Sequence, residues 1–190
     1  AVLEDVGLVS GAVFVDYDSD GAQDLVLATE WGSPKLFENT DSGFIDRTDE
    51  LGFAHFTGLW NGVAAGDFNE DGYPDFVATN LGENSYYEVR GDGEPVKIFY
   101  GDFNRDQRVD MIEAYHLQEV GGFVPLNPLQ DFDNINDILG HIQSHEQFSN
   151  MTVGDMLRTD ETRIPAKEVS TLQHMLFLSD GGGGFNAVPL

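Results

Sequence analysis

One acidic pattern of nine residues occurs three times in this chain and strongly limits the folds available to it. The pattern is D-[YF]-[DN]-x-D-[GQ]-x-x-D, and its copies occupy residues 16–24, 67–75 and 102–110. Each copy is followed by a short apolar run. Self-similarity along a chain is the signature of repeat architectures, in which each repeat is one small structural unit. We name the copies loop one, loop two and loop three, and we predict a chain built from repeated units.

The spacing of the oxygen-bearing side chains predicts a calcium site in each loop. Calcium takes about 6–8 oxygen ligands at roughly 2.3–2.6 Å, and a tight loop directs side chains 1, 3 and 5 toward one centre. The carbonyl of residue 7 and the carboxylate of residue 9 complete the shell. The predicted side-chain ligands are Asp16, Asp18, Asp20 and Asp24 in loop one, Asp67, Asn69, Asp71 and Asp75 in loop two, and Asp102, Asn104, Asp106 and Asp110 in loop three. The predicted carbonyl ligands are those of Ala22, Tyr73 and Arg108.

Position 6 of the pattern separates loop three from the other two. Gly21 and Gly72 occupy this position in loops one and two, where a sharp turn favours a positive φ. Loop three has Gln107 instead, which predicts a strained or altered turn. We therefore expect Ca²⁺ as the cofactor, with two to three ions bound. An Asx-rich turn without metal remains the alternative for every loop.

The start of the pattern also fits an EF-hand, which needs a bidentate Glu at position 12 and a helix on each side. Position 12 is Leu27 in loop one and Ala78 in loop two, and only loop three offers an acid, Glu113. Residues 25–29 and 76–80 are short and rich in β-branched and aromatic residues, which favours strands. We therefore predict strand–loop–strand units and an all-β fold class with a small helical insertion.

Three segments resemble the FG-GAP and VCBS-type repeats found in integrin α-subunit heads and in many secreted bacterial proteins: "GAVFVDYDSDGAQDLVLAT", "NGVAAGDFNEDGYPDFVATN" and "KIFYGDFNRDQRVDMIEAY". A second element, "KLFENTDSGFIDRTDELGF" (35–53), resembles the strand pair between calcium loops of that family and partly recurs at residues 175–190. The resemblance implies an integrin-α-like β-propeller with calcium held between two strands of a blade. At about 40–50 residues per blade, this chain supplies roughly three to four blades. Propellers have about 4–8, so we expect a partial propeller whose remaining blades come from a longer chain or a partner chain.

Residues 116–167 interrupt the repeats. A helical stripe is formed by Ile135, Ile138, Leu139 and Ile142. Thr152 followed by Asp155 fits a capping box at the start of another helix. We predict propeller blades with three calcium loops over residues 1–115, a helical insertion and polar connection over residues 116–167, and returning blade strands over residues 168–190. In this insertion the chain resembles a bacterial secreted subgroup of the family.

Two further sets of side chains have both a functional and a structural interpretation. His141 and His145 have the spacing of zinc ligands on one helix, but no Glu follows the first His, and a solvated helix face explains them as well. Exposed aromatic side chains could form a sugar- or protein-binding face, whereas packing between blades would bury them. The candidates for this face are Trp31, Trp60, Tyr86 and Tyr87.

The charge balance excludes several classes of partner. The chain has 34 acidic and 9 basic residues, a formal net charge of −25, which repels nucleic acid and anionic lipid. No apolar run is long enough to span a membrane, and cysteine is absent. No nucleophile elbow, phosphate-binding loop or dinucleotide fingerprint occurs.

We therefore predict a non-catalytic, calcium-binding module of a secreted, cell-surface or periplasmic protein. Its role would be recognition, cell adhesion or carbohydrate binding, with a glycan or an extracellular protein as partner. Any export signal is expected to have been removed or to lie outside this sequence. The alternatives are the propeller portion of a polysaccharide-acting hydrolase or lyase, and a purely structural scaffold.

Overall fold

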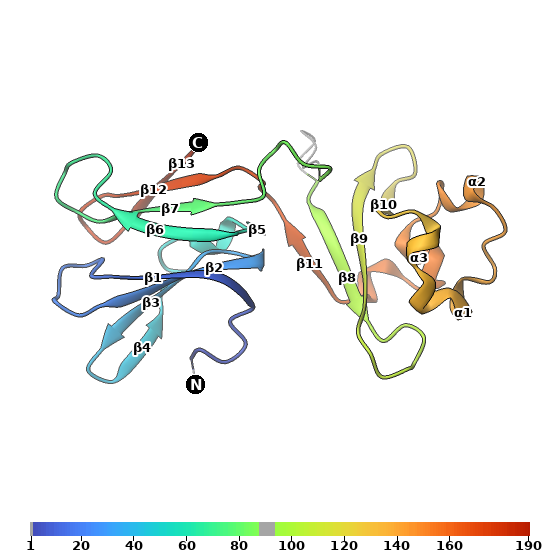
Figure 1. Ribbon diagram of the computed structural model, residues 1–190, viewed down its shortest axis with the longest axis horizontal. Helices are drawn as coiled ribbons and strands as arrows, with labels where there is room; N and C mark the ends of the chain where they lie inside the picture. Colours follow the sequence, from blue (N-terminus) through green and yellow to red (C-terminus); the bar gives the residue numbers. More distant parts are fainter. Residues whose placement is uncertain (1, 88–93) are drawn as a thin grey trace. The chain divides into compact units, whose positions relative to one another are not determined.

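The computed structural model of the chain describes residues 2–87 and 94–190. These residues divide into two compact units, unit 1 with Ala1–Tyr87 and Val169–Leu190, and unit 2 with Glu88–Glu168. Both are built mainly from antiparallel β-sheet with a few short helices, which confirms the predicted mostly β fold class (Figure 1). In the described part of the chain, no helix is both long enough and apolar enough to cross a membrane.

The first sheet of unit 1 is an up-and-down arrangement of four strands with a short fifth strand added. Its strand order is β1-β2-β3-β4, and β5 pairs with β2 beyond the residues of β2 that pair with β3. The strands are β1 (Leu8–Val15), β2 (Asp24–Gly32), β3 (Lys35–Thr40), β4 (Gly43–Asp46) and β5 (Gly58–Leu59). Strand β2 reads almost continuously apolar and is buried along most of its length, as a central strand requires. A tight turn with Gly43 at φ 110° joins β3 to β4.

The second sheet of unit 1 has the same up-and-down order but is interrupted in the sequence. Its strand order is β13-β12-β7-β6. The strands are β6 (Gly62–Gly66), β7 (Asp75–Thr79), β12 (Met175–Ser179) and β13 (Phe185–Pro189). Unit 2 is inserted in the chain between β7 and β12, the second and third strands of this sheet. Strands β12 and β13 form the hairpin expected for residues 175–190, with a glycine-rich turn between them.

The core of unit 1 lies between its two sheets. It contains Val26 and Leu36 from the first sheet and Phe76 and Phe177 from the second, all at most 1% exposed. Phe53, in the 3-10 helix η1 (Phe53–His55), packs against Phe177 with ring centroids 4.9 Å apart. An apolar face on each sheet thus explains why the two sheets pack together.

The proposed aromatic face does not form. Trp31, Trp60 and Tyr87 are buried, and Tyr86 alone of the four candidates is exposed, at 68%. Trp60 donates its indole N–H to the Phe56 carbonyl, and Trp31 packs edge-on against Tyr87. Large aromatic side chains bury much apolar area, and three of these four stabilise unit 1 in this way.

Unit 2 contains a third antiparallel sheet. Its strand order is β10-β9-β8-β11. The strands are β8 (Val96–Gly101), β9 (Asp110–Leu117), β10 (Gly122–Pro125) and β11 (Ala166–Val169), the last ending at the boundary with unit 1. The buried residues Phe99, Ile112 and Phe123 of this sheet begin an apolar core that the helical segment completes.

Short helices cover the sheet of unit 2. They are η2 (Leu129–Asp131), η3 (Asp133–Ile135), α1 (Asn136–Leu139), α2 (His145–Phe148), α3 (Val153–Leu157) and η4 (Glu161–Arg163). Ile135, Val153 and Met156 are fully buried in the same cluster as Ile112. The capping box expected at Thr152 and Asp155 is present at the start of α3.

Two details of the predicted insertion differ from the structure. Residues 116–125 are not helical, because β9 runs to Leu117 and pairs with β10 through the turn at Gly121. His141 and His145 do not share a helix, since α1 ends at Leu139 and α2 begins at His145. The two imidazoles therefore lack the helical spacing on which the zinc hypothesis depended, and among the described residues neither lies in a group of three or more metal-binding side chains.

Candidate metal centres

Each acidic loop joins the first two strands of its sheet. Loop one connects β1 to β2, loop two connects β6 to β7, and loop three connects β8 to β9. Loops one and two extend from the same end of unit 1, at the left of Figure 1. Strands on both sides of every loop exclude the EF-hand, which places a helix on each side.

The carboxylates of positions 1 and 5 accept hydrogen bonds from the backbone of their own loop. In each loop the position-1 carboxylate accepts from the amide of position 6, with distances of 3.0 Å for Asp16, 2.9 Å for Asp67 and 2.9 Å for Asp102. The position-5 carboxylate accepts from the amide of position 7, at 2.7 Å in loop one, 2.9 Å in loop two and 2.8 Å in loop three. These bonds fold the backbone of each loop around its acidic side chains.

The backbone conformation needed for this turn is left-handed at two positions. Position 6 has φ 93° at Gly21, 93° at Gly72 and 70° at Gln107, so the strain predicted for loop three is present. Position 4 is also left-handed, in residues that are not glycine: Ser19, Glu70 and Arg105, with φ of 63°, 61° and 65°. Sequence reasoning missed position 4, because no glycine marks it.

Position 9 differs from the other predicted ligand positions because its carboxylate is buried. Asp24 and Asp75 are 0% exposed and Asp110 is 3% exposed. One oxygen of each accepts the backbone amide of position 2, at 3.0 Å in loop one, 2.8 Å in loop two and 3.0 Å in loop three. The position-9 aspartate therefore closes its loop whether or not a cation is bound.

The second oxygen of position 9 binds an element outside the loop. Asp24 accepts the amide of Asn39 at 2.8 Å, and Asp75 accepts the amide of Ser179 at 2.8 Å. These donors belong to the neighbouring strands β3 and β12. In loop three Asp110 accepts instead from the side-chain amide of Asn134, at 2.7 Å. Sequence reasoning missed these three donors, because each is distant from its loop along the chain.

Loop one brings its carboxylates closest together. Oxygens of Asp16, Asp18 and Asp24 lie within 4.8 Å of one another, and this is the one such group of acidic, His or Cys side chains among the described residues. Asp16 Oδ1 is buried and has no hydrogen-bond partner within the described part of the chain. A buried carboxylate oxygen without a donor is costly, and a cation beside it would remove that cost. The donor set and the unpartnered oxygen fit the calcium ion that the family resemblance implies.

The electrostatics of Asp24 point the same way. Burial raises the pKa of the Asp24 carboxyl, and Asp18 and Asp20 raise it further, while hydrogen bonds from the amides of Asn39 and Tyr17 lower it. The negative charges of the loop thus oppose one another in the absence of a cation. A divalent ion would supply the missing positive charge.

Loops two and three carry less charge than loop one. Position 3 is Asn69 in loop two and Asn104 in loop three, where loop one has Asp18. The Asn69 side-chain amide donates to Asp71 Oδ2 at 2.8 Å. Each of these loops retains three carboxylates, one amide oxygen and the same backbone turn, so both fit a calcium ion of lower affinity, because affinity follows ligand charge. The carbonyls of Ala22, Tyr73 and Arg108 remain predicted ligands.

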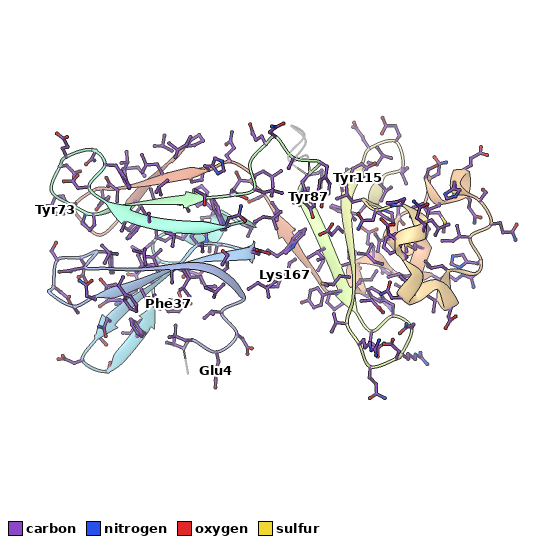
Figure 2. The ribbon with its side chains drawn as sticks, in the orientation of Figure 1. Glu4, Phe37, Tyr73, Tyr87, Tyr115 and Lys167 are labelled. Atoms are coloured by element: carbon purple, nitrogen blue, oxygen red, sulfur yellow. The ribbon has the colours of Figure 1, made fainter. Side chains whose placement is uncertain are left out.

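A cavity of about 280 Å³ opens beside loop one. It is lined by residues of loop one, of loop two, of the end of β12 and of the β12–β13 turn: Tyr17, Asp18, Tyr73, Ser179, Gly181, Gly182 and Gly183. Tyr73, at the tip of loop two, is half-exposed (Figure 2). Tyr17 is buried, and burial together with the charges of Glu38, Asp18 and Asp24 raises the pKa of its phenol to about 12.

The fold and the loops define a class of protein with repeated antiparallel sheets, in which an acidic loop joins the first two strands of each sheet. Residues 16–78 match the model of the FG-GAP-like repeat family. The chain therefore carries an FG-GAP-like repeat, and the match runs from the first ligand position of loop one to strand β7. Such a repeat suggests a β-propeller-type repeat module. Loop three lies outside the matched residues, and a search of curated proteins gave no significant match.

Proposed function

We propose that the three loops bind Ca²⁺ and that the chain is a calcium-stabilised, non-catalytic repeat module. The observation that carries this proposal is the buried, unpartnered oxygen of Asp16 beside the carboxylates of Asp18 and Asp24. The loops are largely exposed at positions 3 to 8 and contribute little apolar burial. An ion bound by oxygens from both ends of a loop would join the two flanking strands at that end of the sheet.

We further propose that the sheets are blades of a β-propeller. The two sheets of unit 1 share one strand order and carry the acidic loop at the same place. The remaining blades would come from a longer chain or from a partner chain. A blade buries its faces against its neighbours, so further blades would cover exposed apolar side chains such as Leu8 and Phe14 of β1.

The compartment that suits such a module is extracellular, on the cell surface or in the periplasm. Extracellular calcium modules work with dissociation constants of about 10⁻⁴–10⁻³ M, so millimolar calcium fills about half of such sites or more. We propose recognition of a glycan or an extracellular protein as the role of the module, including cell adhesion. The cavity beside loop one supports the glycan, because it combines the aromatic ring of Tyr73 with the polar side chains of Asp18 and Ser179.

A calcium titration followed by thermal melting tests the calcium proposal. Because only the folded loops hold the ion, the melting temperature should rise with calcium and return to its starting value when a chelator is added. At a calcium concentration 100 times the dissociation constant, one site adds about 2.7 kcal/mol. Magnesium is the control ion, since it demands a stricter octahedral geometry and should stabilise the protein less.

Single-loop variants assign the sites. Asp20→Ala and Asp71→Ala should each remove one bound ion, counted by equilibrium dialysis. Asp41→Ala is the matched control, because Asp41 is an exposed acid outside the loops and its loss changes the net charge equally. An Asp41→Ala protein that loses as much calcium as the loop variants, or a wild-type melting temperature unchanged by calcium, would reject the proposal.

A glycan array on the calcium-loaded protein tests the recognition role. Tyr73→Ala should lower any glycan signal, because Tyr73 lines the cavity, whereas Tyr86→Ala removes another exposed tyrosine that does not line it. An equal loss in both variants would show that the cavity is not the binding site.

A further inference from the structure

Loop three differs from the other loops in the source of one hydrogen bond. In loops one and two, the outer oxygen of the position-9 aspartate accepts a backbone amide from the neighbouring strand. In loop three the neighbouring strand is β10, which pairs with β9 through Pro125 opposite Ala114. In this register the partner of Asp110 would lie four residues after Pro125, where β10 has already ended. Among the described residues, no strand donates to Asp110 on this side.

The sequence explains why β10 ends early. In the other two sheets the donors Asn39 and Ser179 lie one residue beyond the register partner of the position-9 aspartate. If the β9–β10 register continued past Pro125, Gln130 would occupy this position in the sheet of unit 2. Pro125 and Pro128 precede that position, and proline has no amide to donate to a ladder. The chain leaves the sheet after Leu126, whose amide still binds the Glu113 carbonyl, and enters the 3-10 helix η2 at Leu129.

Asn134 replaces the missing strand. Its side-chain amide donates to Asp110 Oδ1 at 2.7 Å, and its backbone carbonyl accepts from the side-chain amide of Asn104 at 2.8 Å. Asn134 therefore contacts two of the four side chains predicted to bind calcium in loop three. Because the Asn134 carbonyl accepts from the side-chain nitrogen of Asn104, it fixes the orientation of the Asn104 side chain. The oxygen Oδ1 of Asn104 then faces the loop and accepts from the Asp106 amide at 3.1 Å.

The residues beside Asn134 hold it in place. Phe132 and Ile135 are 4% and 0% exposed and pack in the core of unit 2. Ile112, two residues beyond Asp110 on β9, is fully buried in the same cluster. The position of Asp110 and the packing of residues 129–139 thus depend on one another through both a hydrogen bond and a shared core.

We propose that Asn134 is a positioning residue for the calcium site of loop three, and that calcium binding at this loop and docking of residues 129–139 stabilise each other. The proposal rests on the proposed calcium binding of the loops. Coupling between binding and docking is reciprocal, so a change that loosens residues 129–139 must weaken calcium binding, and calcium must strengthen the docking. The helical segment is thereby part of the metal centre.

Hydrogen exchange measured by mass spectrometry across a calcium titration of the whole chain tests this coupling. In the wild-type protein, calcium should slow exchange in residues 103–110 and in residues 132–139 with one common midpoint. In Asn134→Ala the midpoint for loop three should rise about tenfold, which corresponds to about 1.4 kcal/mol, while the midpoints for loops one and two stay unchanged. Calcium should then no longer protect residues 132–139.

Two further variants separate positioning from simple damage. Gln130→Ala is the matched control, because Gln130 is exposed in the same segment and should leave the loop-three midpoint unchanged. Asn134→Leu removes the donor but keeps the side-chain size, and it should reproduce the rise seen in Asn134→Ala. Protection of β8 and β9 in the absence of calcium reports whether each variant is folded.

The outcomes distinguish failure of this proposal from failure of the calcium proposal. If calcium protects no loop, the proposed function fails and the coupling fails with it. If loops one and two respond but loop three does not, the coupling and the loop-three site are both overturned, while calcium binding at loops one and two stands. If loop three responds but wild-type residues 132–139 do not follow it, only the coupling is overturned. Equal calcium midpoints for loop three in wild type and in Asn134→Leu would also overturn the coupling.

Discussion

The position-9 aspartate of loop two should be a structural residue first and a ligand second. Asp75 is 0% exposed and accepts two backbone amides, from Phe68 and from Ser179, both at 2.8 Å. Asp75→Ala leaves both amides without an acceptor. The Ser179 bond is buried, and the Phe68 bond is partly buried. A buried donor left unsatisfied costs about 1–3 kcal/mol, so the free energy of unfolding should fall by about 1–3 kcal/mol for the Ser179 amide and by a smaller amount for the Phe68 amide. Folded domains are stable by about 5–15 kcal/mol in total, so this loss is large.

One opposing effect is smaller. Removing a carboxylate relieves repulsion from Asp67 and Asp71 in the metal-free protein. Those two side chains are exposed, and charge interactions at exposed positions contribute about 0–1 kcal/mol. The loss of one buried and one partly buried hydrogen bond outweighs this relief, so the variant should be less stable than wild type even without calcium.

Urea unfolding in the presence of a chelator, followed by tryptophan fluorescence, measures this effect. The chain has two tryptophans, Trp31 and Trp60, and both belong to unit 1, which also contains loop two. Asp71→Ala is the matched control from the same loop, because the amide of Tyr73 that it leaves unpaired is exposed to water. It should cost less than about 1 kcal/mol without calcium.

The comparison between the two variants carries the conclusion. If the free energies of unfolding of Asp75→Ala and Asp71→Ala in the presence of chelator differ by less than about 0.5 kcal/mol, position 9 has no structural role beyond that of an ordinary surface site. The free energy of unfolding of Asp75→Asn should lie between those of wild type and Asp75→Ala, since the asparagine keeps one acceptor oxygen.

Three other predictions follow from the loops. The phenol of Tyr17 has its pKa raised from 10.0 to about 12, so its protonated form favours folding, and about 2–3 kcal/mol of stability present below pH 10 should be lost as the pH rises to 12. Urea unfolding of Tyr17→Phe should lack this loss. Gln107→Gly should stabilise the protein by up to about 1 kcal/mol in thermal melting, because Gln107 has φ 70°, whereas Gly72→Ala should destabilise it by a similar amount. Asp18→Asn should lower the calcium affinity of loop one toward that of loop two, which a competition titration with a fluorescent chelator measures. If loops one and two of the wild-type protein bind calcium with equal affinity, the role given to ligand charge is contradicted.

The sequence by itself determined the loops. The spacing of Asp67, Asn69 and Asp71 and the glycine at position 72 follow from what a short turn must do, and the structure shows the left-handed turn there. The strands on either side were predictable because apolar, β-branched runs fit a half-buried sheet. The capping box at Thr152 was predictable because it is also a local feature: its hydrogen bonds join residues only three apart.

The tertiary structure alone decided what the loops are attached to. Asp75 and Ser179 are 104 residues apart, and only the pairing of β7 with β12 brings them together. Burial of Trp60, the early end of β10 and the contact of Asn134 with Asp110 likewise depend on long-range packing. Local spacing fixes which oxygens face one another within a turn, whereas register and burial are set by the free energy of the whole sheet and core, which no nine-residue pattern contains.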